Sequence, residues 1–467
     1  MSELLSILLT LALVGVLIYI IARNQHPTQT LAWVLVIIFL PVVGLILYFL
    51  VGHRPSRKRL LPAHERDILK QRVCDAQGEY RNEAPGDFPG VSRLVAQTNQ
   101  SLPLAGNDVK VYVSFFPMLD DLVADLEQAR DHIHFEFFKF EDDPCGRRVA
   151  EVLMRKAREG VAVRVQYDDL ANLWRKKFYR ELKAAGVQVE PFIALTFPVL
   201  SADTNFRNHR KVVVIDGKVG YMGGMNIAER YGKGLSWGPW RDTHLRLEGP
   251  VVAEMQVAFL SDWRFSSKEL LAATRYFPSC GAKGERLVQL LASGPMDEWH
   301  VAMQGFVQLL ATARDYVYVQ SPYFVPTPEV MLALKNAALS GKDVRVMIPR
   351  RGDGGPLVPL ASKSYLSEVL ASGVKIYFYD KGFLHAKTIV ADDCFASVGS
   401  TNLDVRSYQL DFEIDAYMYD RALATEMKAI FLRDVEDSEW ITLEKWAQRS
   451  RLEKFKESLA RLLSPLL

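Results

Sequence analysis

Cysteine is scarce in this chain, and the few cysteines are scattered. Among 467 residues only Cys74, Cys145, Cys280 and Cys394 occur. They form no C-x-x-C pair and no other spacing typical of metal ligands. The sequence therefore predicts isolated thiols, which fits a reducing, cytoplasmic setting, and no cysteine-based metal centre.

A strong net charge is also lacking. The 57 lysines and arginines nearly balance the 55 aspartates and glutamates, which leaves a formal charge of +2. A field this weak does not indicate a nucleic-acid partner, so any selectivity for anions must arise locally. With 49% hydrophobic residues, the chain is long enough to build a large core in one or two domains.

Charged residues are absent from two long stretches near the N-terminus, Leu4 to Ala22 and Leu31 to Val51. An α-helix needs about 20 residues to cross a hydrocarbon core about 30 Å thick, and both stretches reach that length. Tyr19, Trp33 and Tyr48 lie toward their ends, where aromatic rings prefer the membrane interface. The pattern predicts a transmembrane helical hairpin within residues 1–55.

A cleaved signal peptide is the alternative for the first stretch. That stretch lacks a basic N-terminal region, however, and a second apolar run follows closely. Basic residues crowd the exit of the second run, whereas only Arg23 lies in the connection, which predicts that the rest of the chain faces the cytoplasm. The same residues could also contact anionic headgroups. They are Arg54, Arg57, Lys58, Arg59 and Arg66.

An internal repeat occupies the rest of the chain. The β-rich segment 132–140 corresponds to 316–324, segment 159–167 to 340–348, and segment 185–192 to 372–379, with helical stretches between them. Alternating strands and helices are typical of an α/β fold. After a linker over 56–104, we predict two tandem αβ units over 105–285 and 286–467, each a mixed sheet flanked by helices, related by a pseudo-twofold axis.

Each repeat carries the motif H-x-K-x4-D. The first copy is His209, Lys211 and Asp216, and the second is His385, Lys387 and Asp392. Alternation along a strand places histidine and lysine on one face, where both can address one ligand. The two aspartates belong to the candidate catalytic set through the motif, but both fall at predicted turns, which favours a structural role over proton transfer.

Further residues match between the copies after each motif. Gly224 and Asn226 in "GGMN" correspond to Ser400 and Asn402 in "GSTN". Small residues allow a phosphate to approach the backbone, and asparagine supplies further donors, so these four are candidate substrate-binding residues. Farther along, an acid recurs in each copy and could orient a histidine. These acids are Asp242 and Glu413.

A single histidine at the end of a strand is usually structural, but two matched sets offer an imidazole nucleophile, a general acid and several phosphate-binding groups. Two lysines can neutralise the charge that a metal would otherwise handle, so we expect neither metal nor cofactor. Zinc binding by His209 and His385 is the alternative, and the nearby lysines argue against it because an ammonium repels a cation. The pattern predicts a site that handles phosphodiesters.

These residues resemble the phospholipase D superfamily, whose duplicated H-x-K-x4-D motif is matched at all six positions. The words "NHRKVVVIDGKVGYMGGMNIAERY" and "GFLHAKTIVADDCFASVGSTNLDVRSYQLDFEID", together with "QSPYFVP" and the second apolar run, are similar to bacterial cardiolipin synthases. The resemblance covers nearly the whole chain. Asp411 departs from it, because asparagine is expected there.

The resemblance implies a phosphatidyltransferase of the bacterial inner membrane, with phosphatidylglycerol as both donor and acceptor and no nucleic acid as partner. His209 would attack phosphorus, releasing glycerol, and His385 would protonate that glycerol and then deprotonate the incoming hydroxyl. Lys211, Lys387, Asn226 and Asn402 would hold the phosphoryl oxygens. Each acid would stand behind the histidine of the opposite half. That pairs Glu413 with His209 and Asp242 with His385.

A hydrolase and a non-catalytic lipid-binding protein are also compatible with these residues. A membrane-bound hydrolase would use the same groups with water as acceptor, whereas two intact motifs speak against a protein without catalysis. The apolar loop Ile193 to Ser201, with Trp237 and Trp240, could form a lipid entrance or belong to the core. An amphipathic C-terminal helix within residues 451–467 could dock on the domain or lie on the membrane.

Overall fold

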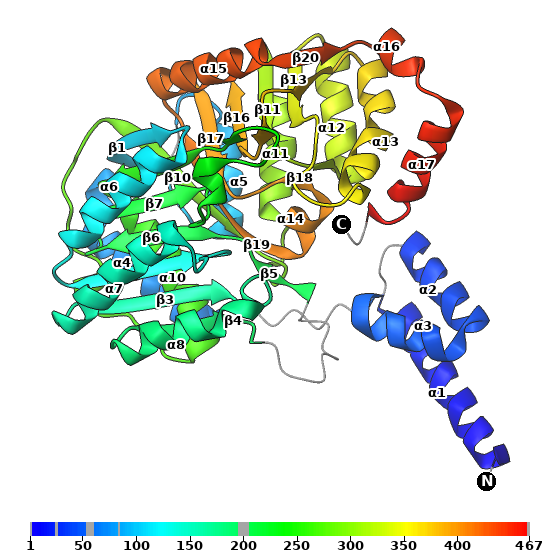
Figure 1. The fold of residues 1–467 in the computed structure, drawn as a ribbon, viewed down its shortest axis with the longest axis horizontal. Helices are drawn as coiled ribbons and strands as arrows, with labels where there is room; N and C mark the ends of the chain where they lie inside the picture. Colours follow the sequence, from blue (N-terminus) through cyan, green and yellow to red (C-terminus); the bar gives the residue numbers. More distant parts are fainter. Residues whose placement is uncertain (1, 24–26, 53–59, 83–84, 195–204, 465–467) are drawn as a thin grey trace. The chain divides into compact units, whose positions relative to one another are not determined.

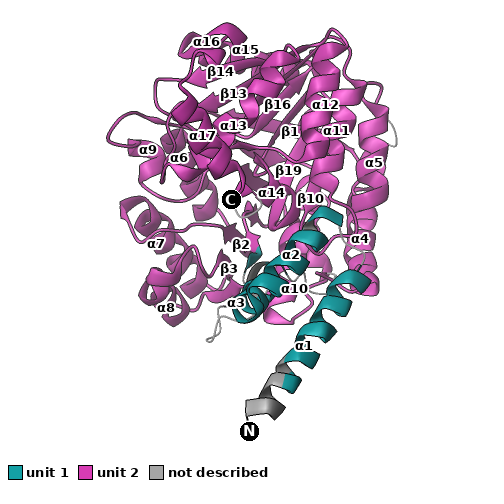
Figure 2. Cartoon of the chain, turned by 90° about the vertical axis from the view of Figure 1, so that its right-hand side faces the viewer, with its two compact units in different colours: residues 1–58, 195–206 teal, residues 59–194, 207–467 magenta. Residues whose placement is uncertain are grey.

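The computed structural model describes residues 2–23, 27–52, 60–82, 85–194 and 205–464. The chain divides into two compact units. Residues 1–58 with 195–206 form the smaller unit, and residues 59–194 with 207–467 form the larger one. Figure 2 shows the two units in different colours.

The smaller unit is helical. Its elements are α1 (Ser2–Ala22), α2 (Pro27–Phe39), α3 (Pro41–Leu47) and a π-helical turn over Tyr48–Gly52. The prediction of one continuous helix over 31–51 is therefore wrong. Leu40 leaves the helical region, with φ −132° and ψ 68°, because Pro41 follows it and has no backbone N–H to continue the helix.

A small apolar cluster holds these helices together. Ile20, Ile37 and Tyr48 are buried against one another, and the ring of Trp33 meets that of Tyr48 edge to face at 5.6 Å. Over the described residues, none of the helices combines the length and the apolar character that a membrane crossing requires.

The larger unit is built on one sheet of 16 strands within the described residues. Each half contributes the same sequence of strands, and the halves join where β1 pairs antiparallel with β10. The first half provides β1 (Leu104–Tyr112), β2 (His132–Phe137), β3 (Ala162–Asp168), β4 (Gln188–Phe192), β5 (Arg207–Asn208), β6 (Lys211–Ile215), β7 (Val219–Gly223) and β9 (His244–Glu248). The second provides β10 (Arg286–Ser293), β11 (Tyr316–Gln320), β13 (Asp343–Pro349), β14 (Lys375–Tyr379), β16 (Thr388–Ala391), β17 (Phe395–Gly399) and β19 (Asp411–Met418), with β20 (Ser438–Ile441) at its edge.

The order of the strands repeats as well. In the first half it runs β4-β3-β2-β6-β7-β9-β1, and in the second β14-β13-β11-β16-β17-β19-β10. Strands β2, β3 and β4 are parallel, as are β11, β13 and β14, whereas β2 pairs antiparallel with β6, and β11 with β16. This confirms the predicted duplicated, mixed α/β fold, with the difference that the two halves share one sheet.

Helices cover both faces of the sheet in the same way in each half (Figure 1). On one face lie α6 (Phe115–Glu127), α7 (Pro144–Arg158) and α8 (Lys176–Ala184), matched by α11 (Val301–Thr312), α12 (Pro328–Leu339) and α13 (Leu357–Ala371). On the other lie α10 (Val252–Ser267) and α15 (Arg421–Glu436). Alternation along β11 explains this, because Val317 and Val319 face α11 to α13 while Tyr318 packs on Phe431 of α15.

The segment 56–104, predicted as a linker, contains two helices that pack on the larger unit. They are α4 (Ala63–Gln77) and α5 (Pro89–Asn99). Leu69 and Val73 of α4 enter a cluster with Val257 of α10, and Val91 and Val95 of α5 enter the core of the second half. The polar composition of the segment concealed these four apolar positions, which have helical spacing.

Candidate active site

The two histidine motifs meet at the seam between the halves, and each is held by the backbone of the opposite half. The short strand β5 (Arg207–Asn208) pairs with β19, and His209 N donates to Phe412 O at 2.9 Å. Likewise β15 (Phe383–Leu384) pairs with β8 (Trp240–Arg241), and His385 N donates to Arg241 O at 2.7 Å. Each histidine therefore lies beside the residue that follows its backbone partner.

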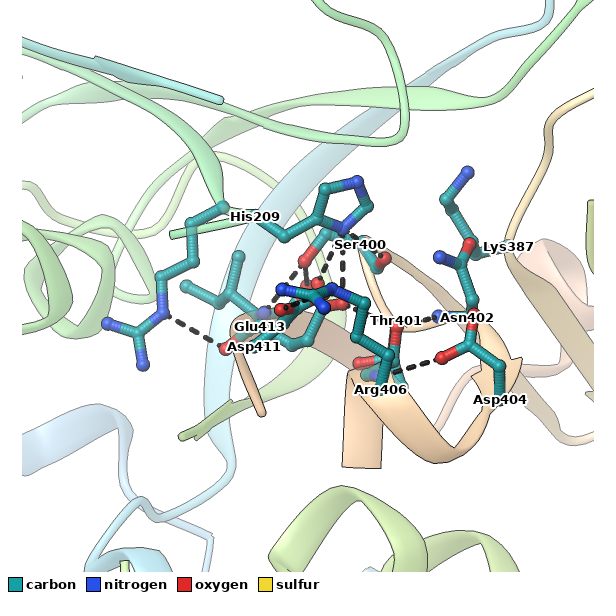
Figure 3. A network of polar contacts seen from close by, with 12 residues as sticks. His209, Lys387, Ser400, Thr401, Asn402, Asp404, Arg406, Asp411 and Glu413 are labelled. Atoms are coloured by element: carbon teal, nitrogen blue, oxygen red, sulfur yellow. Dashed lines mark hydrogen bonds and ion pairs between the residues drawn. The ribbon is translucent and has the colours of Figure 1, made fainter. Parts of the chain in front are cut away.

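Those following residues are the two acids. Both oxygens of Glu413 lie 3.1 Å from His209 Nδ1, and Asp242 Oδ2 lies 2.6 Å from His385 Nδ1. This is the crosswise pairing that the family resemblance implies. Figure 3 shows the His209 ring above Glu413 and Ser400. A carboxylate that accepts from Nδ1–H fixes the tautomer and leaves the Nε2 lone pair free.

Each motif lysine contacts the histidine that lies two residues before it. Lys211 Nζ donates to the carbonyl oxygen of His209, and Lys387 Nζ donates to that of His385. Lys387 Nζ also lies 3.0 Å from His385 Nδ1. The contact with the Asp242 carboxylate is shorter, so we assign a proton to Nδ1 that is donated to Asp242. Both ammonium groups therefore stand beside the imidazoles that they would assist.

Burial dominates the ionisation of the site. It lowers the pKa of His209 and of His385 well below 6.5, and Lys211 and Lys387 lower both further. Burial also lowers the pKa of Lys211 to about 7 and of Lys387 to about 8. It raises the pKa of Glu413 to about 7 and that of Asp242 above its usual range. Both imidazoles are therefore neutral at neutral pH, as a nucleophile must be.

Asp216 and Asp392 lie away from this cluster, at the hairpin turns that follow β6 and β16. Each has φ 51°. The Asp216 carboxylate accepts hydrogen bonds from the backbone N–H groups of residues 130, 131 and 132, at 2.8 to 2.9 Å. Asp392 accepts from residues 314, 315 and 316 in the same way, at 2.6 to 3.0 Å. Both aspartates fasten the start of a central strand, which favours the structural interpretation.

We predict that Asp216→Asn lowers the free energy of unfolding by ~1–3 kcal/mol, because the amide has one acceptor oxygen for three backbone donors. Turnover by the folded protein should stay within about twofold of the original. Denaturant unfolding of the purified protein, with an activity assay at a permissive temperature, measures both. The exposed Asp67→Asn serves as the matched control. Loss of turnover at unchanged stability would instead make Asp216 a proton carrier.

The four candidate substrate-binding residues are placed differently from one another. Gly224 packs on an orienting acid, since a Cβ there would collide with the Asp242 carboxylate. Ser400 accepts from Ile414 N at 2.9 Å and offers its carbonyl oxygen 3.2 Å from His209 Nδ1. These two residues position the acid and the histidine rather than stand open to a ligand.

The two asparagines also differ. Asn226 donates to Tyr231 Oη at 2.5 Å and accepts from Lys139 N at 3.0 Å, so its amide already serves the protein. Asn402 has a buried side-chain oxygen without a hydrogen-bond partner in the described part of the chain. That oxygen is an acceptor, so it can receive a hydrogen bond from a ligand hydroxyl but cannot itself hold a phosphoryl oxygen.

The sequence did not predict three neighbours of the site, Phe138, Tyr231 and Ser407, although it did single out Trp240. Ser407 donates from its hydroxyl to Glu413 Oε1 at 2.7 Å, and the ring of Phe138 lies edge-on 5.0 Å from His209. Tyr231 and Trp240 lie 5.8 and 5.1 Å from the His385 ring. Ser407 and Tyr231 each lie five residues after the matched asparagine but differ in type, so the repeat did not mark them.

The structure places the two tryptophans of the predicted lipid entrance but describes little of its loop. Trp240 is buried in the core with Phe383, whereas Trp237 is half-buried and packs on the same cluster. Most of the loop Ile193 to Ser201 lies outside the described residues.

Asp411, where asparagine was expected, is buried and forms an ion pair with Arg406 at 3.1 Å (Figure 3). Among described residues, no three His, Cys, Asp or Glu side chains gather as metal ligands.

Comparison with known proteins identifies two matching family models. One, described as "Cardiolipin synthase, PLD-like domain", matches residues 122–263 and 306–435, and one described as "Phospholipase_D-nuclease N-terminal" matches residues 7–53. The major cardiolipin synthase ClsA of Bacillus subtilis is 38% identical over 100% of this chain and 99% of its own length. A cardiolipin synthase of Listeria innocua is also 38% identical, with the same coverage.

Solved structures show a likeness in fold alone. The phosphatidylserine synthase of Haemophilus influenzae superposes with a TM-score of 0.60 at 16% identity, covering 80% of this chain and 96% of that one. A polyphosphate kinase of Porphyromonas gingivalis reaches 0.50 at 13% identity, covering 73% and 49%. At such identities, function must be argued from the site.

Proposed function

Because this chain belongs to the cardiolipin synthases of the phospholipase D superfamily, we propose that it transfers a phosphatidyl group from one phosphatidylglycerol to another. The observation that carries the proposal is the crosswise pair of neutral histidines, each held at Nδ1 by a buried acid. Such a pair can perform two successive displacements at one phosphorus atom.

In the first step His209 Nε2 attacks the phosphorus of the donor, forming a P–N bond while the P–O bond to the glycerol headgroup breaks. His385 gives a proton to the departing glycerol oxygen. Bound phosphodiester carries a negative charge that offsets Lys211 and Lys387, so the pKa of His385 rises from its depressed value when substrate binds. The lysines donate to the phosphoryl oxygens, and so does Asn402 through its amide N–H group.

In the second step a hydroxyl of another phosphatidylglycerol attacks the same phosphorus. His385, now neutral, takes the hydroxyl proton, the P–N bond breaks, and cardiolipin leaves with His209 restored. Glu413 stabilises the positive charge that His209 carries while it is bound to phosphorus. Aromatic rings of Phe138, Tyr231 and Trp240 surround the imidazoles and disfavour water as acceptor.

Incubating the detergent-purified protein with phosphatidylglycerol alone, and resolving the lipids by mass spectrometry, tests the proposal. Cardiolipin with an equal amount of glycerol is the expected result. Phosphatidic acid without cardiolipin would show that water is the acceptor and would leave a hydrolase built on the same residues.

We further propose that the N-terminal hairpin anchors the protein in the bacterial inner membrane, with the larger unit in the cytoplasm. The two charge-free stretches and the basic residues after the second one support this placement. A site tethered in this way meets lipid headgroups at high local concentration. Recovery of the protein from membranes by an alkaline carbonate wash alone would contradict the anchor.

A further inference from the structure

The loop that follows β3 exposes apolar side chains. Leu170 is 46% exposed, Leu173 38% and Trp174 87%. Single exposed apolar residues are common on protein surfaces, but three within five residues, one of them a nearly bare tryptophan, are not. Exposed apolar loops of this kind are typical of surfaces that contact a membrane or another molecule.

This rim loop, residues 170–174, is fastened to the catalytic centre. At its start, Asp168 accepts a hydrogen bond from Asn208 N at 3.1 Å, one residue before His209. Within it, Asn172 donates to Phe138 O at 2.7 Å, and the Phe138 ring packs on His209. The exposed side chains therefore stand at the edge of the active site, on a backbone whose position is fixed by buried polar contacts.

Basic residues follow the rim loop directly. Lys177 is exposed at the start of α8. Lys176 is also exposed but pairs with Asp169, and Arg175 is half-buried in an ion pair with Glu141 at 2.6 Å. Apolar tips beside lysines and arginines are the composition that binds anionic lipid surfaces, where the apolar groups enter the headgroup region and the cations stay in contact with phosphate.

We propose that the rim loop inserts into the surface of an anionic bilayer and holds the active-site edge against it. The inference rests on the proposed function, since it concerns how a lipid substrate reaches His209. The phosphodiester of a lipid lies near the headgroup plane of the bilayer. An active site whose edge enters that plane shortens the distance that each lipid must move out of the bilayer to reach it. Leu170, Leu173 and Trp174 would leave water on insertion, which favours the docked state.

Kinetics on two kinds of substrate test the proposal. We expect Leu170→Ser with Leu173→Ser and Trp174→Ser to raise the apparent KM for phosphatidylglycerol in vesicles about tenfold or more. Turnover of a short-chain phosphatidylglycerol below its micelle concentration should stay within about twofold. The matched control is Leu332→Ser with Leu339→Ser, which removes from α12 two leucines that are more exposed than Leu170 and Leu173. An unchanged KM in vesicles would overturn the proposal.

Fluorescence tests insertion without relying on activity. In vesicles containing phosphatidylglycerol with brominated acyl chains, the wild-type protein should lose more emission than Trp174→Phe. Equal quenching would mean that Trp174 stays in water or faces a second copy of the chain, and either result overturns the proposal. Because this measurement needs no turnover, a failure of the proposed function alone would leave its result intact.

A second apolar surface supports an independent proposal. The C-terminal helix α17 (Arg451–Arg461) packs on α13 through the buried residues Glu457 and Ala460. Arg449 pairs with Glu457, and Arg461 donates to Glu368 at 2.8 Å. The polar side of this amphipathic helix thus faces the protein, so the helix docks on α13 through polar contacts.

Its apolar side faces outward. Leu452, Phe455 and Leu459 are 57–65% exposed, and Arg451 and Lys456 flank them at helical spacing. We infer that this stripe rests on an anionic lipid surface, because the flanking cations match the charge of the headgroups. Docking on the domain and contact with the membrane are therefore compatible, since they use opposite sides of one helix.

A tryptophan placed in the stripe tests this inference. Phe455→Trp should be quenched by brominated phosphatidylglycerol more than the wild type, whereas Leu332→Trp on α12, at a comparably exposed leucine, should not. Equal quenching of the two variants would overturn it. So would a dimer in detergent that Leu452→Gln with Leu459→Gln converts to a monomer, because the stripe would then cover a second copy.

Discussion

Replacing His209 with alanine is expected to lower the rate of cardiolipin formation by about 10⁴-fold or more, because the chemistry then has no group to accept the phosphatidyl moiety. The pocket itself should survive, since the backbone contact of residue 209 with Phe412 O does not involve the side chain. Mass spectrometry of the lipids after incubation with phosphatidylglycerol measures the loss. The exposed His64→Ala is the control.

The companion variant His385→Ala removes the proposed general acid, and about 10²–10⁴-fold should be lost. Rapid quenching in denaturant at mildly alkaline pH, where the P–N bond survives, followed by peptide mapping separates the two roles. The wild type should carry the phosphatidyl adduct on the peptide that contains His209. An adduct on His385 would reverse the assignment while leaving the two-step transfer in place. Full activity in either variant would remove the histidine mechanism altogether.

Much of this site could be predicted from the sequence because its signals are local. The spacing H-x-K-x4-D combines a strand that projects histidine and lysine to one side with a turn that receives the aspartate. The structure has the turns at Asp216 and Asp392 as expected. Local signals also predicted β2, β3 and β4 and their counterparts, since period-two apolar patterns follow from how strands pack.

What the sequence could not show depends on contacts between distant segments. Ser407 reaches Glu413 only because the short helix α14 (Val405–Gln409) folds back on β19. The single continuous sheet depends on β1 meeting β10, for which no local pattern exists. The break in the predicted helix 31–51 was signalled by Pro41, but helices in apolar surroundings can tolerate proline, so composition did not decide it.

The orienting acids provide the second large effect. Glu413→Gln and Asp242→Asn should each lower kcat about 10²–10⁴-fold. An amide in place of the carboxylate keeps the size of the side chain but can present N–H to Nδ1, which favours the wrong tautomer, and it no longer stabilises a positively charged imidazole. The exposed Glu444→Gln is the matched control. A rise in KM at unchanged kcat would mean that the acids bind substrate and do not orient the histidines.

The pH profile separates orientation from simple structural support. Burial raises the pKa of Glu413 to about 7, so the carboxyl is ionised above that pH and protonated below it. Since only the carboxylate supports His209, kcat/KM of the wild type should fall as pH decreases through about 7. It should also fall as pH rises through about 7 to 8, where Lys211 and then Lys387 lose their protons. Glu413→Gln should lack the acid limb and keep the alkaline one, because kcat/KM reports the free enzyme. An unchanged acid limb in Glu413→Gln would assign that ionisation to another group and leave Glu413 a structural residue.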